Sequence, residues 1–347
     1  MAADAFSPPY RPPAPAPEAR IVWPEAFGQR FTIMVDTEEE FDWRAPLVRE
    51  AQATTAIAAL PAAHRRFAAR GVPVTYLVDW PIVASSRAVQ VLKSLLDDGR
   101  SAIGTQLHPW VNPPFDEPVT PANSFPGNLP EALEAAKLDQ LTDAIAQAFG
   151  TGPIAYRAGR YGIGPATLKL LAARGYRLDS SMRARYDYRM AGGPDFATIG
   201  NDAFRTGPDR KLVELPLTTI HTGLLRAGGE ILYRLAGRIP HGRGLLSRAG
   251  LLSRVALTPE DMPIDDALEA VRVAVGEGVR VLNFSFHSPS VAPGHTPYVR
   301  DKADLARFFA WWEAMLDTLD RLGVRPASLE EIVAAADDAL ASAPCPA

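Results

Sequence analysis

The sequence predicts an α/β protein whose parallel sheet closes into a single barrel. From Arg30 onward, short apolar runs alternate with Ala/Leu-rich stretches of helical spacing, which is typical of β–α units. The 347 residues would suffice for two domains, but seven strand candidates in one continuous alternation favour one barrel. No internal repeat of fixed period is present.

Each strand candidate is a short apolar run that ends in turn-forming or polar residues. These runs are residues 31–36, 72–79, 101–108, 153–157, 176–179, 212–217 and 279–287. Stretches with apolar residues at helical spacing separate most of them. These helix candidates are residues 51–70, 85–98, 131–149, 164–174, 263–277 and 301–322.

Three segments depart from this alternation. Residues 1–28 are proline-rich, and we expect a disordered tail ahead of a barrel that spans residues 29–340. Residues 109–130 hold seven prolines and should form a long structured loop. Residues 221–258 form an expected helical insertion with six arginines and one acid, Glu230. This insertion is either a solvated basic face or a lid that attracts an anionic substrate or a membrane surface.

Composition excludes several classes of protein. Thirty-six basic against 40 acidic residues give a net charge of −4, which offers no support for nucleic-acid binding. The single cysteine, Cys345, rules out an internal disulfide framework and a cysteine-rich zinc site. No apolar run approaches the length of a membrane span, and the first residues lack the pattern of a secretion signal. We therefore expect a cytoplasmic protein; its oligomeric state is not predictable.

Polar residues end nearly every strand candidate. Because active sites of parallel α/β barrels lie at the carboxyl ends of the strands, these side chains are expected to converge. Alternation along a strand places Gln106 with His108 on one face, and Ser285 with His287 on one face. The strand-end residues are Asp36, Asp79, His108, Arg157, Asp179, Glu214 and His287.

The first strand runs into the acidic stretch DTEEEFDW. In an extended chain, Asp36 and Glu38 share a face about 6.6 Å apart. At an effective dielectric constant near 20 they repel each other by roughly 2.5 kcal/mol, so a cleft that holds both ionised needs a cation. His108 as a further metal ligand and Arg157 as a counter-charge are the candidates. The other acids of the stretch, Glu39, Glu40 and Asp42, are expected in a solvated loop.

Four runs of the sequence form a recognisable set, and they are VDTEEEFDW, AIGTQLHPWVNPPF, YRAGRYG with LDSSM, and NFSFHSPSVAPGHTPYVR. These runs resemble the polysaccharide deacetylases of the NodB-homology type, and most closely their WalW-like branch. The likeness extends in family order from about residue 30 to residue 330. It implies a single distorted (β/α)7-type barrel of the glycoside hydrolase/deacetylase kind, with the arginine-rich segment inserted.

The resemblance also implies residue roles for a metal-assisted hydrolysis of an N-acetyl group on a sugar. Asp36 matches the family's general base, and Arg157 matches the arginine that orients this base. Glu38 and His108 match ligands of a divalent metal, with zinc as the first choice. His287 matches the histidine that protonates the departing amine.

The chain departs from the family pattern at two positions. The second motif usually has two histidines, and Gln106 occupies the place of one; its carbonyl oxygen is a weaker zinc ligand than imidazole. His295 is a candidate for the missing nitrogen, or else a loop histidine bonded to nearby backbone. Gly159 stands where proline is common, which should loosen that turn.

Trp43, Trp110 and Tyr161 follow strand ends, where aromatic rings either stack on a sugar or pack in the core. The first hypothesis is a hydrolase of carbon–nitrogen bonds that deacetylates a cell-surface polysaccharide or its precursor. A second is a hydrolase of a small non-sugar amide or cyclic imide. A third is a sugar-binding protein without catalysis, for which Gln106 is the main argument.

Overall fold

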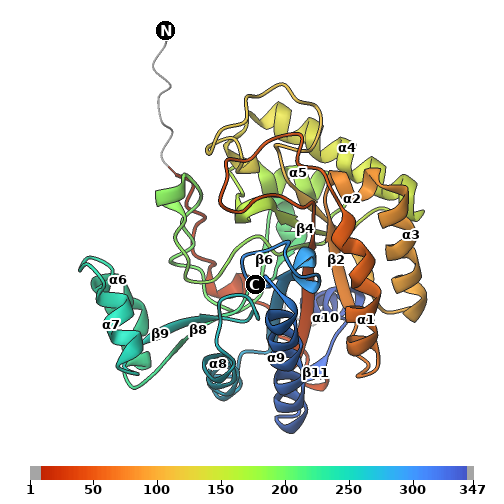
Figure 1. The fold of residues 1–347 in the computed structure, drawn as a ribbon. Helices are drawn as coiled ribbons and strands as arrows, with labels where there is room; N and C mark the ends of the chain where they lie inside the picture. The colour runs from red at the N-terminus through yellow and green to blue at the C-terminus, as the bar shows by residue number, and fades with distance from the viewer. Residues whose placement is uncertain (1–8, 342–347) are drawn as a thin grey trace.

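A curled parallel sheet forms the centre of the protein, in a computed structural model that describes residues 9–341 (Figure 1). Its seven parallel strands follow the order β10-β1-β2-β3-β4-β5-β7, and they are the seven strands predicted from the sequence. The distorted (β/α)7-type barrel is thus confirmed. The strands are β1 (Arg30–Thr37), β2 (Val74–Val78), β3 (Ala102–Leu107), β4 (Ala155–Ala158), β5 (Leu178–Asp179), β7 (Leu212–Glu214) and β10 (Val281–His287).

Four further strands were not predicted. The antiparallel strand β6 (Phe204–Thr206) extends the sheet beyond β7, and β11 (Arg325–Pro326) pairs with the start of β1. The strands β8 (Thr219–Thr222) and β9 (Ser253–Ala256) form a separate antiparallel ribbon.

Most of the helices lie on the outer side of the sheet (Figure 1). The predicted helix over residues 131–149 is present with those bounds as α4 (Glu131–Phe149), which ends at Gly150 in a left-handed conformation. The other helices of the barrel are α1 (Leu60–Ala68), α2 (Trp80–Ala84), α3 (Ser86–Leu95), α5 (Thr167–Ala173), α8 (Ile264–Gly276), α9 (Lys302–Arg321) and α10 (Leu329–Ala341). Of these, α2 and α10 were not predicted from the sequence.

Between β7 and β10 the barrel closes without a strand ladder. The backbone N–H of Thr218 donates to the carbonyl of Asn283 (3.3 Å), and the Asn283 N–H donates to the Thr218 hydroxyl (2.9 Å). Leu257 bridges Thr218 and Ser285 in the same way. These hydrogen bonds pair the backbone groups at the free edge of β10 with irregular chain instead of a strand. This irregular closure is the distortion of the barrel.

The barrel interior has an apolar floor and a polar upper layer. Met34, Leu77 and Val213 pack with Ile332 of α10 in one buried cluster. Asp36 lies two residues beyond Met34 on the same face of β1, at the carboxyl end of the strand. The strands therefore have apolar side chains in contact at the floor of the barrel, and polar side chains at its open end.

Residues 9–28 differ from the expected disordered tail, whose residues 1–8 lie outside the described part. Trp23 is buried in the floor cluster, and the Ile21 N–H donates to the carbonyl of Ala203 (2.9 Å). A few apolar side chains between the prolines are enough to hold this segment on the barrel, because they cover floor surface that would otherwise meet water.

The insertion forms an arm that stands clear of the barrel (Figure 1). The β8–β9 ribbon leads to two short helices at its end, α6 (Gly229–Ala236) and α7 (Gly242–Arg248). Among the described residues, no helix is both long and apolar enough to cross a membrane.

The proline-rich segment 109–130 is a structured loop, as predicted. The buried ammonium group of Lys137 on α4 donates to the carbonyls of Pro109 (3.0 Å), Asn112 and Pro114 (both 2.6 Å), and pairs with Glu117 (3.1 Å). One cation thus fastens the first part of the loop to the barrel.

The end of this loop meets the turn after β4 through two glycines. The Gly127 N–H donates to the Gly162 carbonyl (2.7 Å), and a Cβ on Gly127 would lie 1.9 Å from the backbone nitrogen of Gly164. Only a residue without a side chain allows this approach.

Gly127→Ala should therefore lower the free energy of unfolding by roughly 1–3 kcal/mol, because the two backbones must separate. Gly152→Ala is the matched control, since nothing lies within 4 Å of its Cβ position. Thermal and denaturant unfolding of both variants would measure the difference. Equal stability of the two variants would contradict the contact.

Candidate active site

A pocket of about 560 Å³ opens at the carboxyl ends of the parallel strands. Of the site residues predicted from the sequence, only Arg157 and His295 do not line it. The predicted residues that do are Asp36, Glu38, Trp43, Gln106, His108, Trp110, Tyr161 and His287. Of the seven strand-end residues, three converge at the pocket: Asp36, His108 and His287. The other four do not line it: Asp79, Arg157, Asp179 and Glu214.

Asp36 and His287 lie side by side at the rim. They are directly paired in the register of β1 and β10, and His287 Nε2 lies 3.7 Å from Asp36 Oδ2. The fully buried Arg157 on β4 donates to the other oxygen, Asp36 Oδ1, from across the barrel. Asp36 is thus held by a guanidinium on one oxygen and exposes the second oxygen to the pocket.

Arg157 is itself fixed by Ser180. Its Nε donates to the Ser180 carbonyl (2.9 Å), and a terminal nitrogen donates to the Ser180 hydroxyl (3.0 Å). The amide of Asn283 on β10 also donates to that hydroxyl (2.8 Å). The orientation of the guanidinium toward Asp36 therefore depends on three strands.

Glu260 is a site residue that the sequence did not reveal. Its carboxylate accepts hydrogen bonds from His287 Nδ1 (2.7 Å), from the His287 backbone N–H (3.1 Å) and from the Ser290 hydroxyl (2.5 Å). Burial opposes the charge of His287, but the neighbouring carboxylates, first of all Glu260, raise its pKa to about 10. Glu260 lies in a loop beyond β9, where no local pattern marks it.

Glu38, Gln106 and His108 form a second group at the pocket wall. Gln106 Nε2 donates to Glu38 Oε2 (3.4 Å), and His108 Nε2 lies 3.6 Å from the same oxygen. Within residues 9–341, Glu38 Oε1 and Gln106 Oε1 are buried without a hydrogen-bond partner. Burial also raises the pKa of Glu38 to about 8, against the effect of the two histidines. Two unsatisfied oxygens beside an imidazole nitrogen fit the donor set of a divalent cation.

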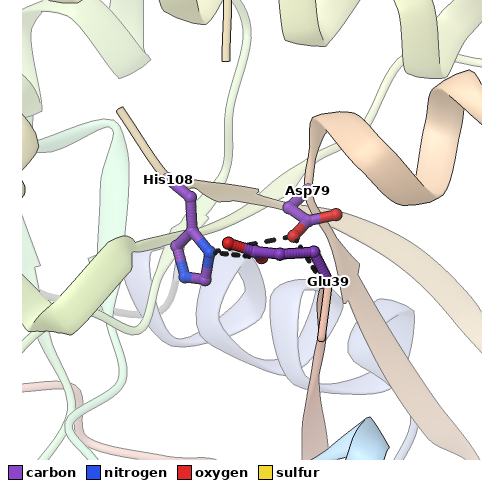
Figure 2. Close-up of side chains that lie close together, drawn as sticks. All are labelled: Glu39, Asp79 and His108. Carbon is purple, nitrogen blue, oxygen red and sulfur yellow. Dashed lines mark hydrogen bonds and ion pairs between the residues drawn. The ribbon is translucent and has the colours of Figure 1, made fainter. Parts of the chain in front are cut away.

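Glu39 is fully buried, so the expectation of a solvated loop is wrong for this residue. Its carboxylate faces His108 Nδ1 (2.9 Å), and its backbone N–H donates to Asp79 Oδ2 (2.9 Å) (Figure 2). The carboxylate also accepts from the indole N–H of Trp110 (2.8 Å). Glu39 points to the opposite side from Glu38, where the ends of β2 and β3 meet. The run of acidic residues after β1 did not predict that Glu39 is buried.

Glu39, Asp79 and His108 also form a group whose ligand atoms lie within 4.8 Å of one another, close enough for a metal ion. However, Glu39 Oε1 accepts from Trp110, Asp79 Oδ2 accepts from the Glu39 backbone N–H, and neither Glu39 nor Asp79 lines the pocket. Burial raises the pKa of both carboxyl groups. We interpret them as the pair that fixes the His108 ring and directs its Nε2 toward Glu38.

The remaining acids and His295 lie apart from this group. His295 Nδ1 lies 3.1 Å from Glu40 Oε2, so the imidazole of His295 contacts the carboxylate of Glu40 and not that of Glu38. Glu40 is half-buried and accepts from the Thr55 hydroxyl (2.9 Å), unlike the solvated residue that was expected, whereas Asp42 is exposed as predicted. Asp179, like Asp79, is buried behind the pocket wall.

Aromatic rings form the rest of the wall. The edge of Trp43 meets His287 with ring centres 4.9 Å apart, and Tyr161 stacks on Tyr188 at 5.6 Å. Trp110 stacks on His108 at 4.3 Å and is only 2% exposed, so it supports the histidine more than it faces a ligand.

Gly159 allows the turn after β4 to lie close to His108. A Cβ at this position would lie 2.5 Å from Cδ2 of His108 and 2.5 Å from the carbonyl oxygen of Leu107. The next two residues, Arg160 and Tyr161, have positive φ angles of 54° and 60°, which are unfavourable for both side chains. The turn is therefore shaped around His108.

No protein-family model and no curated protein matches the chain. A putative polysaccharide deacetylase from Mycobacterium smegmatis has the same fold, with a TM-score of 0.52 and 18% identity over 96% of this chain and 99% of that chain. The Puue allantoinase matches with a TM-score of 0.52 and 14% identity over 97% of this chain and 96% of that chain. The resemblance to the deacetylases is confirmed at the level of the fold, while the WalW-like branch stays a prediction.

The Glu260–His287 contact predicts a measurable change in the pKa of His287. Glu260→Gln should lower this pKa from about 10 toward the ordinary value of about 6.5, because the imidazolium loses its nearest carboxylate. A histidine-resolved NMR titration would measure it. The control is Asp261→Asn, an exposed neighbour. An unchanged pKa in Glu260→Gln would rule out this carboxylate as the cause.

Proposed function

We propose that the protein is a hydrolase that removes an N-acetyl group from a carbohydrate. The observation that carries the proposal is the pairing of Asp36 with His287 at the rim of the pocket, with Arg157 behind Asp36. A carboxylate and an imidazolium 3.7 Å apart are a base and an acid that can act on the same bond. The shared fold with a putative polysaccharide deacetylase supports the same reaction class.

In this proposal Asp36 accepts a proton from the attacking water through Oδ2. Arg157 holds Oδ1, so the carboxylate cannot turn away from the pocket. His287 donates a proton to the nitrogen that leaves as the amine. Glu260 keeps the imidazole charged and directs Nε2 toward the reacting groups, because it holds Nδ1.

Glu38, Gln106 and His108 would hold a divalent cation, with zinc as the first choice. When bound, such a cation would supply Lewis-acid activation of the acetyl carbonyl and of the water. Glu39 and Asp79 would keep Nε2 of His108 free for this role. The positive charge of the cation would also offset the desolvation of the Glu38 carboxylate, because burial raises the pKa of this group to about 8.

Carbohydrate is the proposed substrate class because the pocket combines these polar groups with aromatic rings. Trp43, Tyr161, Tyr188 and Tyr298 line it, and such rings pack on the apolar faces of sugars. A cell-surface polysaccharide or its precursor is therefore proposed as the substrate.

A second candidate is hydrolysis of a small cyclic amide. The Puue allantoinase favours it, because this enzyme matches the chain with the same TM-score as the putative deacetylase. Allantoin assayed beside N-acetylated sugars separates the two candidates. Turnover of allantoin without acetate release from any sugar would replace the first proposal.

Asp36→Asn should reduce acetate release by roughly 10²–10⁴-fold, because the amide cannot accept the proton from water. An acetate-release assay on N-acetylated sugars, with and without zinc, would measure this loss. Asp97→Asn is the control at an exposed acid away from the pocket and should keep full activity. Unchanged turnover in Asp36→Asn would exclude Asp36 as the base.

Metal content after dialysis would test the proposed ligands separately from activity. His108→Ala should lose bound zinc, and Gln106→His should bind it more tightly, because imidazole is the better ligand. His295→Ala should bind zinc like the unaltered protein, since His295 contacts Glu40 instead. Zinc retained in His108→Ala and lost in His295→Ala would reverse the assignment.

A further inference from the structure

The arm formed by α6 and α7 carries an unusual share of exposed apolar side chains. Six of the eleven large hydrophobic residues that are exposed among residues 9–341 lie between positions 224 and 245, each 40% to 81% exposed. Apolar groups gathered at one place on a surface mark a site of contact. They are Leu224, Leu225, Ile231, Leu235, Ile239 and Leu245.

Arginines are interleaved with these residues. Glu230 is the only acid between Glu214 and Glu260, and it pairs with Arg185 at the base of the arm (3.2 Å). Five exposed arginines of the arm have no acidic partner within ion-pair distance in the described part of the chain. They are Arg226, Arg234, Arg238, Arg243 and Arg248.

The two kinds of side chain share one face of α6. Ile231 and Leu235 are four residues apart, as are Arg234 and Arg238, so both pairs form adjacent rows. Ile239 continues the apolar row into the turn that leads to α7. The opposite face is used inside the arm, where Ala236 is buried. The outward face is thus amphipathic and has no partner in the described residues.

We propose that this face docks on the surface of an anionic lipid bilayer. Exposed leucine and isoleucine would enter the boundary between headgroups and acyl chains, and the unpaired guanidinium groups would bind lipid phosphates. The charge of the arm complements such a surface, whereas the chain as a whole carries −4. The arm stands clear of the barrel, so its tip can meet a plane without obstruction (Figure 1).

The base of the arm is rigid enough to hold the protein in a fixed orientation. Arg254 on β9 lies over the ring of Tyr186 at 3.6 Å and over Tyr233 of α6 at 4.9 Å. Arg185 donates to the Thr219 carbonyl on β8 (2.7 Å). These contacts fasten both strands of the ribbon to the barrel. The proposal is independent of the chemistry proposed for the pocket.

Sedimentation with vesicles tests the proposal on the full chain. The protein should bind phosphatidylcholine vesicles that contain phosphatidylglycerol, bind weakly to phosphatidylcholine alone, and dissociate as salt is raised. Arg234→Gln with Arg238→Gln should lower the partition coefficient roughly thirtyfold at low salt. Ile231→Ser with Ile239→Ser should lower it as well, because the apolar contribution is lost.

Matched controls lie on other surfaces of the protein. Arg87→Gln with Arg272→Gln removes two exposed charges of α3 and α8, and Val22→Ser removes an exposed apolar side chain. These variants should bind vesicles like the unaltered protein. All substituted residues are exposed, and circular dichroism would verify folding.

Three results would overturn the proposal. One is equal binding to both kinds of vesicle, or to neither. Another is unchanged binding in both arm variants. The third is self-association that Ile231→Ser with Ile239→Ser abolishes in the absence of vesicle binding, which would make the face an interface between copies of the chain.

Discussion

The ion pair between Arg157 and Asp36 is the constraint on which the geometry of the pocket depends. Arg157 has no exposed surface, and a buried guanidinium is tolerated only where its donors are used. Asp36 takes one donor, and Ser180 takes two. Because Ser180 is also bonded to Asn283 of β10, the pair joins opposite parts of the barrel. Asp36 therefore cannot rotate without leaving a buried charge unpaired.

Two histidines at the pocket, His287 and His108, are held by neighbouring groups in the same way. His287 is held by Glu260 as Asp36 is held by Arg157, so each of these two side chains has one atom fixed and one atom directed to the pocket. His108 follows this rule too, with Glu39 on Nδ1 and Nε2 toward Glu38. The apolar floor below them, around Met34, supplies the stability that a rim of buried charges does not.

The sequence could predict what local patterns encode. Each of the seven parallel strands is an apolar run, and Asp36, His108, Arg157 and His287 end or follow such runs, so their convergence follows from the barrel itself. Glu260 could not be found, because its role comes from a loop that meets β10 only after folding. The burial of Glu39 was missed for a related reason, since its partners, Asp79 and Trp110, follow other strands.

The short strands and the packed N-terminal segment lay beyond prediction on similar grounds. β8 and β9 pair only with each other, and Trp23 is buried only because the floor of the barrel leaves room for it. The independence of the β8–β9 ribbon has a consequence for divergence among related chains. No backbone bond of this ribbon's ladder is shared with the nine-stranded sheet, so the tip can change in length or composition without disturbing the register that aligns Asp36 with His287. The tip of the arm and the pocket can then diverge at separate rates within a single polypeptide.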